Sequence, residues 1–317
     1  MVALSLFAVS AWASDSLPHV RFPDRPITII VPFGPGGGSH QMATHIAVPL
    51  RRIMGVDVNV VTLPGNDSKD GIGYFMRQAP DGYTILQHVD ILASLFANGE
   101  IDIDPVKDLT PVAITQITFS QIYIRAIEPR FHTWSGFIEY ARRHPGKLRI
   151  ANTGSARSME QVNMQQLSQR MKFEIRSQPY DRPAKRYMAL VEEQVDALFE
   201  QPGDVAPFLN RKLIKPILTL LPERIDAFAD IPALKEIGMD APPLLRFRGF
   251  FVRSGVPGKI RSYLESCFRQ AYQSSSFQAF NREKYMHLMD SYRNGDEAKK
   301  LVGDAIATYA KPGSGDR

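Results

Sequence analysis

The sequence predicts an α/β fold in which mostly parallel sheets are covered by helices on both faces. Strand-like apolar runs alternate along the chain with segments whose apolar residues recur at helical spacing. The chain has 317 residues, which suggests two domains at roughly 150 residues each. Its hydrophobic content of 44% and charged content of 22% are ordinary for a globular chain with a real core.

The first half of the chain opens this alternation. The predicted elements are, in order, a strand at residues 27–31, a glycine-rich turn at 32–38, a helix ended by Gly55, and strands at 56–61 and 83–86. Pro49 lies inside the helix and should kink it, because proline has no N–H group to donate.

The second half continues the same pattern. It predicts a helix at residues 137–143, a strand at 148–150, a helix at Met159–Met171, a helix at 189–195 and a strand at 197–199. Strands that alternate with helices imply largely parallel sheets. Such sheets bind ligands where the carboxyl ends of strands meet the N-termini of helices.

The N-terminus resembles a cleaved signal peptide. Residues 2–12 are apolar except for serines, and Ala11-Trp12-Ala13 precedes a polar stretch that begins at Ser14. The usual basic segment before the apolar run is missing, so the true start could lie upstream; the alternative is a frayed apolar N-terminus. No later stretch is long and apolar enough for a membrane helix. We therefore predict a signal peptide at residues 1–13 and a soluble protein exported to the periplasm.

Charge and motif content narrow the function classes. The net charge is +5 without a Lys/Arg-rich run, which argues against nucleic acid and favours small anions. The single Cys267 lies on an apolar helical face, so we expect a buried, inert thiol and no disulfide. The chain lacks a Gly-x-Ser-x-Gly nucleophile motif and metal-like histidine spacing. We therefore predict a protein without catalysis, metal or cofactor.

The glycine-rich loop at residues 34–39 is the sharpest candidate site. Glycines let backbone N–H groups turn toward a ligand, and a helix that begins at Ser39 or His40 adds the positive end of its dipole. An anion site and a plain strand-to-helix turn both fit this loop. A nucleotide loop is disfavoured because no Gly-Lys-Ser/Thr follows the glycines.

A second candidate anion site lies at residues 152–158, again between a strand and a helix. Ser158 and Gln161 have capping-box spacing, so one of them is expected to stabilise the helix. Thr153, Ser155 and Arg157 remain available to donate hydrogen bonds to an acidic ligand.

A series of motifs resembles the periplasmic solute-binding proteins of tripartite tricarboxylate transporters, also called Bug proteins. The matching segments follow one another in order: residues 22–33, 36–38, 64–65, 79–86, 104–113, 144–148, 194–196, 230–238 and 249–251. They cover nearly all of the chain after the signal peptide, and the order carries more weight than any single motif.

The resemblance implies a two-lobed binding fold that closes on its ligand without chemistry. One lobe would comprise residues 14–124 and 249–317 and the other residues 125–248, with crossings near 121–125 and 248–252. In this family, backbone groups of the first two loops of the first lobe hold a carboxylate, and second-lobe loops contact the rest of the ligand. The candidate ligand-binding residues are Phe33, Gly34, Gly37, Gly38, Ser39, His40, Gly65, Asn66, Asp67, His88, Thr153, Ser155, Arg157, Tyr180 and Arg182.

This sequence departs from the family at three places in the site. His40 stands where the family usually has Asp, and Tyr180 is followed by Asp181 and Arg182 in place of Lys-Gly. The second loop, residues 64–70, is longer than usual and gains Asp67 and Asp70. These acids would repel a carboxylate unless they point outward or pair with Lys69.

Three functions are consistent with the sequence. The first is a monomeric binding protein that delivers a di- or tricarboxylate or an aromatic acid to the membrane subunits of a tripartite tricarboxylate transporter. The second is a binding protein that signals to a sensor kinase. The third is an exported enzyme on the same fold, which the lack of a nucleophile–base pair near the glycine loop disfavours.

Overall fold

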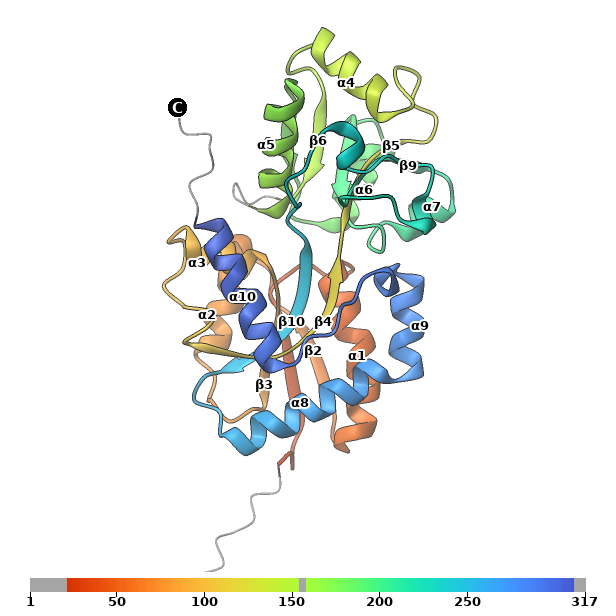
Figure 1. Ribbon diagram of the computed structural model, residues 1–317. Coiled ribbons are helices and arrows are strands. Elements are labelled where there is room, and N and C mark those ends of the chain that lie inside the picture. Colours follow the sequence, from red (N-terminus) through yellow and green to blue (C-terminus); the bar gives the residue numbers. More distant parts are fainter. Residues whose placement is uncertain (1–21, 154–157, 311–317) are drawn as a thin grey trace, which may run out of the picture.

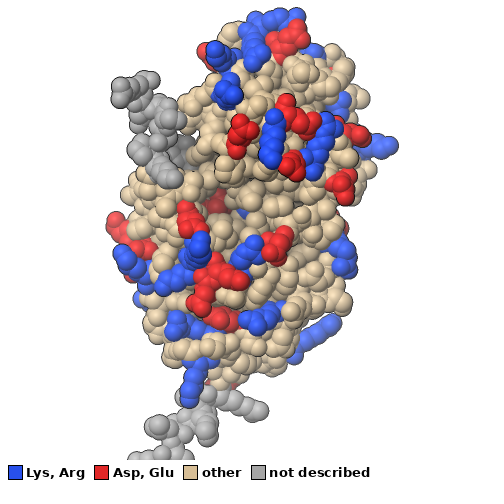
Figure 2. Space-filling view, in the orientation of Figure 1, with Lys and Arg blue, Asp and Glu red and all other residues tan. Residues whose placement is uncertain are grey.

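The computed structural model describes residues 22–153 and 158–310, and it shows two α/β lobes, one above the other (Figure 1). Each lobe is built on one five-stranded sheet. The space-filling view shows a recess between the lobes, with acidic and basic side chains interspersed over this face (Figure 2). The predicted two-lobed α/β fold is confirmed. The predicted signal peptide, residues 1–13, lies outside the described residues.

The sheet of the first lobe has the strand order β2-β1-β3-β10-β4. β1 pairs in parallel with β2 and β3, whereas β10 is antiparallel to both β3 and β4. The sheet is therefore mixed, with β10 alone running against the other strands. The bounds are β1 Ile27–Val31, β2 Val58–Thr62, β3 Thr84–Val89, β4 Leu109–Thr118 and β10 Arg246–Arg253.

The sheet of the second lobe repeats this scheme with the order β7-β6-β8-β5-β9. β6 pairs in parallel with β7 and β8, and β5 is antiparallel to both β8 and β9. In both sheets the reversed strand adjoins a crossing between the lobes. The bounds are β5 Ser120–Arg125, β6 Arg149–Asn152, β7 Arg176–Pro179, β8 Ala197–Glu200 and β9 Ile214–Leu220.

Helices cover both faces of each sheet (Figure 1). In the first lobe, α1 Gly38–Met54, α8 Gly258–Gln273 and α9 Ser275–Glu283 pack on one face, and α2 Lys69–Met76, α3 Ile91–Ala97 and α10 Gly295–Tyr309 on the other. In the second lobe, α4 Trp134–Arg143 and α5 Met159–Met171 lie opposite α6 Pro183–Val191 and α7 Ala206–Asn210. Short 3-10 turns are η1 Asn66–Ser68, η2 Asp226–Phe228, η3 Lys235–Ile237 and η4 Met286–Leu288. Within the described ranges, no helix is long and apolar enough to cross a membrane.

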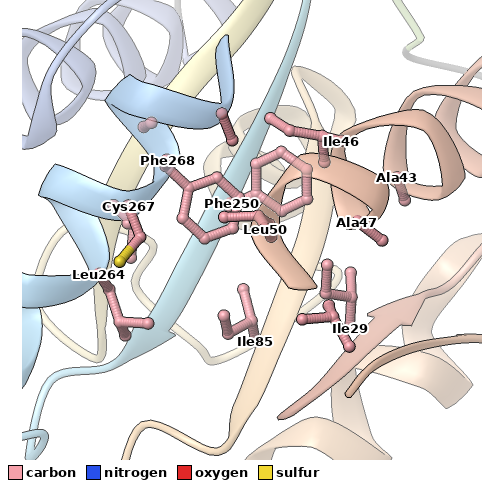
Figure 3. Packing of buried hydrophobic residues seen from close by; sticks show 14 of the residues in the cluster. Ile29, Ala43, Ile46, Ala47, Leu50, Ile85, Phe250, Leu264, Cys267 and Phe268 are labelled. Atoms are coloured by element: carbon pink, nitrogen blue, oxygen red, sulfur yellow. The ribbon is translucent and has the colours of Figure 1, made fainter. Parts of the chain in front are cut away.

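The core of the first lobe lies on both faces of its sheet, because successive strand residues point to opposite sides. Ile29 packs with α1 and α8, whereas its neighbour Ile30 packs with α2 and α3. Figure 3 shows the first of these clusters, in which Phe250 and Phe268 lie 4.5 Å apart between ring centroids. Cys267 is 2% exposed within it, as predicted for an inert thiol.

The chain passes between the lobes at Phe119, which separates β4 from β5, and again between β9 and β10. The boundaries expected near residues 124 and 248 differ from these points, since β5 belongs wholly to the second sheet and β10 to the first. β4 and β5 are separated by one residue and are buried almost throughout, so no turn signal or periodicity shows where the chain changes sheets. We propose residues 22–118 with 246–310, and residues 120–245, as the extents of the two lobes.

Candidate functional site

The glycine-rich loop connects β1 to α1 at the carboxyl end of β1, facing the second lobe. α1 begins at Gly38, slightly before the expected start, and Gly37 is its extended N-cap residue with φ −74° and ψ 168°. Gly36 has φ +82°, a left-handed conformation that glycine adopts without strain. The Gln41 side chain donates to the Gly36 carbonyl at 2.7 Å. The loop therefore brings the N-terminus of α1, with its free N–H groups, to the cleft.

His40 fastens this loop to the first turn of α1. Its Nδ1 accepts a hydrogen bond from the Gly36 N–H at 3.3 Å, and its carbonyl accepts one from Thr44 Oγ1 at 2.8 Å. The imidazole thereby holds the glycine-rich loop against the first turn of α1. Its contact with a ligand stays a prediction.

The second lobe lies directly on the glycine loop. A Cβ atom on Gly37 would be 2.9 Å from Pro183 Cγ at the start of α6, and one on Gly34 would be 3.5 Å from Pro183 Cδ. A Cβ atom on Gly38 would overlap the Asp204 carboxylate and the Arg248 guanidinium. The absence of side chains at these glycines therefore allows the two lobes to close on each other.

Arg248 on β10 forms the first ion pair between the lobes. Its Nη2 donates to Asp204 Oδ2 of the second lobe at 2.5 Å, and its Nη1 donates to Gln116 Oε1 of the first lobe at 3.0 Å. Arg248 is 3% exposed and Asp204 8%. The charge pair is thus buried in the contact between the lobes.

Arg246, two residues earlier on β10, forms a second bridge. Its Nη1 donates to Asp90 Oδ1 of the first lobe at 2.7 Å, and its Nη2 donates to Glu160 of the second lobe. Tyr309 at the end of α10 donates to the other Asp90 oxygen at 3.1 Å. Thr153 Oγ1 donates to Glu160 Oε2 at 3.0 Å. Thr153, a predicted ligand residue, is therefore engaged with this bridge.

Burial and charge act against each other on the two acids of this bridge. Burial raises the pKa of Asp90, and the attraction of Arg246 offsets only part of that increase. For Glu160, burial also favours the neutral acid, but Arg246 together with local hydrogen bonds lowers the pKa overall. Arg246 therefore lowers the pKa of both acids against the effect of burial.

Sequence reasoning missed both arginines and their acidic partners. The available signal was the placement of Arg246 and Arg248 in an otherwise apolar strand, since a charge that interrupts such a run needs a buried partner. The partners lie far away in the sequence, so pairing could not be read from local patterns.

The second loop of the first lobe adopts an unusual left-handed path. Gly65, Asn66, Asp67 and Ser68 have φ values of 148°, 47°, 52° and 74°. Asn66 and Asp67 are exposed, whereas Ser68 is buried. Lys69 pairs with Glu100 at 3.3 Å, whereas Asp67 and Asp70 are exposed. Of the two arrangements considered for these acids, the structure agrees with the one in which they point outward.

His88 lies beneath these loops and supports them. Its Nδ1 lies 2.9 Å from the Val89 nitrogen and 3.2 Å from the Val89 carbonyl oxygen, and its Nε2 forms a hydrogen bond with Ser68 Oγ at 3.1 Å. Its ring meets the Phe33 ring edge-on at 5.2 Å between centroids. Complete burial lowers the pKa of His88 to about 4, so the imidazole is neutral. His88 therefore joins the first and second loops to β3.

The structure describes only some of the predicted ligand-binding residues of the second lobe. The Tyr180 hydroxyl accepts from Gln178 Nε2 at 2.7 Å, and Arg182 is an exposed residue at the N-cap of α6. Ser158 caps α5 by accepting from the Gln161 N–H at 3.3 Å, as predicted. Ser155 and Arg157 lie outside the described residues. No group of His, Cys, Asp and Glu that could hold a metal ion occurs in the part of the chain that the structure describes.

Comparison with known proteins identifies related sequences. The model of the tripartite tricarboxylate transporter family receptor matches residues 42–311. A protein from the gbd 5′ region of Cupriavidus necator is 26% identical over 315 residues, covering 98% of this chain and 93% of the relative. BugT of Bordetella pertussis is 23% identical over 316 residues, covering 98% of this chain and 95% of BugT.

Solved structures share the fold. MatC from Rhodopseudomonas palustris with bound malate matches with a TM-score of 0.81 at 23% identity, over 91% of this chain and 99% of MatC. Another R. palustris protein, with adipate, matches with a TM-score of 0.80 at 20% identity, over 92% of this chain and 96% of that protein. These likenesses establish the two-lobed architecture.

We predict that Gly38→Ala shifts the protein toward an open form without unfolding either lobe. The added methyl group overlaps the Arg248–Asp204 pair, and such overpacking costs roughly 1–3 kcal/mol. Small-angle scattering should show a larger radius of gyration for the variant. Gly34→Ala is the matched control, because its methyl group makes only an ordinary 3.5 Å contact. Equal radii for Gly38→Ala and wild type would contradict the closed contact.

We also predict that His88 makes folding stability fall as the solution is acidified. The folded-state pKa is about 4, below the ordinary value of 6.5, so the unfolded chain binds more protons between these values. The free energy of unfolding should lose on the order of 3 kcal/mol from this group as pH falls through that window. Urea titrations at several pH values should show that the free energy of unfolding falls more steeply with acidification in wild type than in His88→Gln. If the free energy of unfolding of His88→Gln falls with acidification as steeply as that of wild type, the assignment is refuted.

Proposed function

The chain belongs to the tripartite tricarboxylate transporter receptor family, and we propose that it binds a small carboxylate in the cleft between its lobes. A di- or tricarboxylate or an aromatic acid would fit this role. The bound form would deliver the ligand to the membrane subunits of a tripartite tricarboxylate transporter. No chemical conversion of the ligand is part of this proposal.

The observation that carries the proposal is the glycine-lined N-terminus of α1 at the contact between the lobes. Residues 34–38 present backbone with hardly any side chains, and the helix adds a positive dipole end. This arrangement favours an anion that the second lobe covers. The malate in MatC and the adipate in the second R. palustris protein are small carboxylates, which agrees with this chemistry.

The proposal also places the protein outside the cytoplasm. An apolar run followed by Ala11-Trp12-Ala13 is typical of a cleaved export signal, and we propose cleavage after residue 13. Mass spectrometry of the native protein should therefore find a mature chain that starts at or near Ser14. Predominantly intact Met1 would contradict export by this signal.

We predict that at least one small carboxylate raises the melting temperature of the pure protein. A ligand at 100 times its Kd stabilises the folded state by about 2.7 kcal/mol. A thermal-shift screen with malate, adipate, citrate and benzoate tests this, each against its neutral amide as the matched control. A protein that responds equally to acids and amides, or to neither, would not be a carboxylate receptor.

A further inference from the structure

We propose that Asp204 is an internal competitor of the ligand. Its carboxylate fills a carboxylate-binding corner of the first lobe, formed by the start of α1 at Gly38 and by Arg248. A ligand carboxylate enters this corner only when Asp204 has left it. The inference rests on the proposed function. It identifies Asp204 as the residue that a ligand carboxylate must displace in order to bind.

The corner has the geometry of an anion site, and the Asp204 carboxylate occupies it. Both Asp204 oxygens lie against Gly38, where a Cβ atom would overlap them, and one of them accepts from Arg248 Nη2 at 2.5 Å. Asp204 comes from the turn after β8 in the second lobe, held by its N–H to the Gln201 carbonyl at 3.1 Å. A carboxylate from one lobe thus occupies the N-terminal end of a helix in the other.

The receiving groups stay in place when the lobes separate. Arg248 Nη1 donates to Gln116 Oε1 at 3.0 Å, and Gln116 in turn donates to Asn281 Oδ1 at 3.0 Å. Both partners belong to the first lobe. The guanidinium is therefore oriented independently of Asp204, and opening of the lobes leaves it next to the α1 N-terminus without its acid.

Arg248 also has a donor that Asp204 does not use. Its Nε is buried and has no hydrogen-bond partner among the described residues, and the whole residue is 3% exposed. Asp204 contacts the guanidinium through Nη2 alone. A free carboxylate can bind the Nε and Nη2 side in the bidentate manner that arginine favours. The corner is therefore better suited to an incoming carboxylate than to the one that fills it.

The neighbouring bridge at Arg246 is not exchangeable in this way. Arg246 is paired with Asp90 of its own lobe as well as with Glu160, so it keeps an acid when the lobes part. In the described part of the chain, Arg248 has Asp204 as its acidic partner. A buried arginine without an acidic partner raises the free energy of the protein. Binding of either Asp204 or a ligand carboxylate in the corner removes this penalty.

The test uses acetate as a probe, because it is a bare carboxylate independent of the natural ligand. Asp204→Asn removes the charge with little change in shape. Glu128→Gln is the matched control, since Glu128 is also a buried, arginine-paired acid of the second lobe, but its arginine partners, Arg125 and Arg130, belong to the same lobe. Calorimetry and melting curves would be recorded in sodium acetate and in sodium chloride of equal ionic strength.

We expect Asp204→Asn to bind acetate at least tenfold more tightly than wild type or Glu128→Gln, with a rise in melting temperature that chloride does not give. Acetate affinity equal to wild type, or lower, would overturn the inference, because a merely structural ion pair predicts one of those results. Should Asp204→Asn fail to fold, Asp204→Ser carries the same expectation.

The acetate experiment and the carboxylate screen can succeed or fail independently of each other. If the carboxylate screen finds no ligand while Asp204→Asn gains acetate binding, the corner is supported and the receptor role fails. If the screen finds a ligand, its affinity should also increase in Asp204→Asn. A found ligand that binds Asp204→Asn more weakly than wild type would show that Asp204 holds the liganded form and would overturn the competition.

Discussion

The closed arrangement of this protein depends on two buried arginines of one strand. Arg246 and Arg248 leave β10 where the two lobes meet, and each pairs with a carboxylate of the second lobe. A guanidinium removed from water must be paired, and one whose acid is lost leaves a buried uncompensated charge. Charge pairing therefore contributes to holding the lobes together, next to the apolar contact of Pro183 with the glycine loop.

The glycine loop makes this electrostatic contact geometrically possible. Pro183 approaches Gly37 and Asp204 approaches Gly38 so closely that side chains at these two positions would block them. The same bare backbone carries the N–H groups of the first turn of α1. Close approach by the second lobe and access for an anion are thus two results of one sequence feature. His88, neutral and buried, adds rigidity by joining this loop region to β3 through Ser68 and Phe33.

Much of the fold could be predicted from local patterns, whereas the contacts between the lobes could not. The alternation of Ile29 and Ile30 between two helical layers, the cap at Ser158 and the burial of Cys267 follow from periodicity and spacing. The change of sheet at Phe119 leaves no such trace, because the two buried strands follow each other with a single residue between them and no turn signal. The pairs Lys69–Glu100 and Arg248–Asp204 join residues distant in sequence, so only the folded chain shows which acid belongs to which base.

The position of β10 also sets the order in which the two sheets can be completed. In the described part of the chain β4 pairs within the first sheet with β10, and β10 follows the whole second lobe in the sequence. The second lobe is continuous in sequence, so all of its strands are available before the first sheet can be completed. In a chain that appears from its N-terminus, the first sheet therefore ends at β3 with one unpaired edge until β10 follows, while the second lobe already has all of its strands.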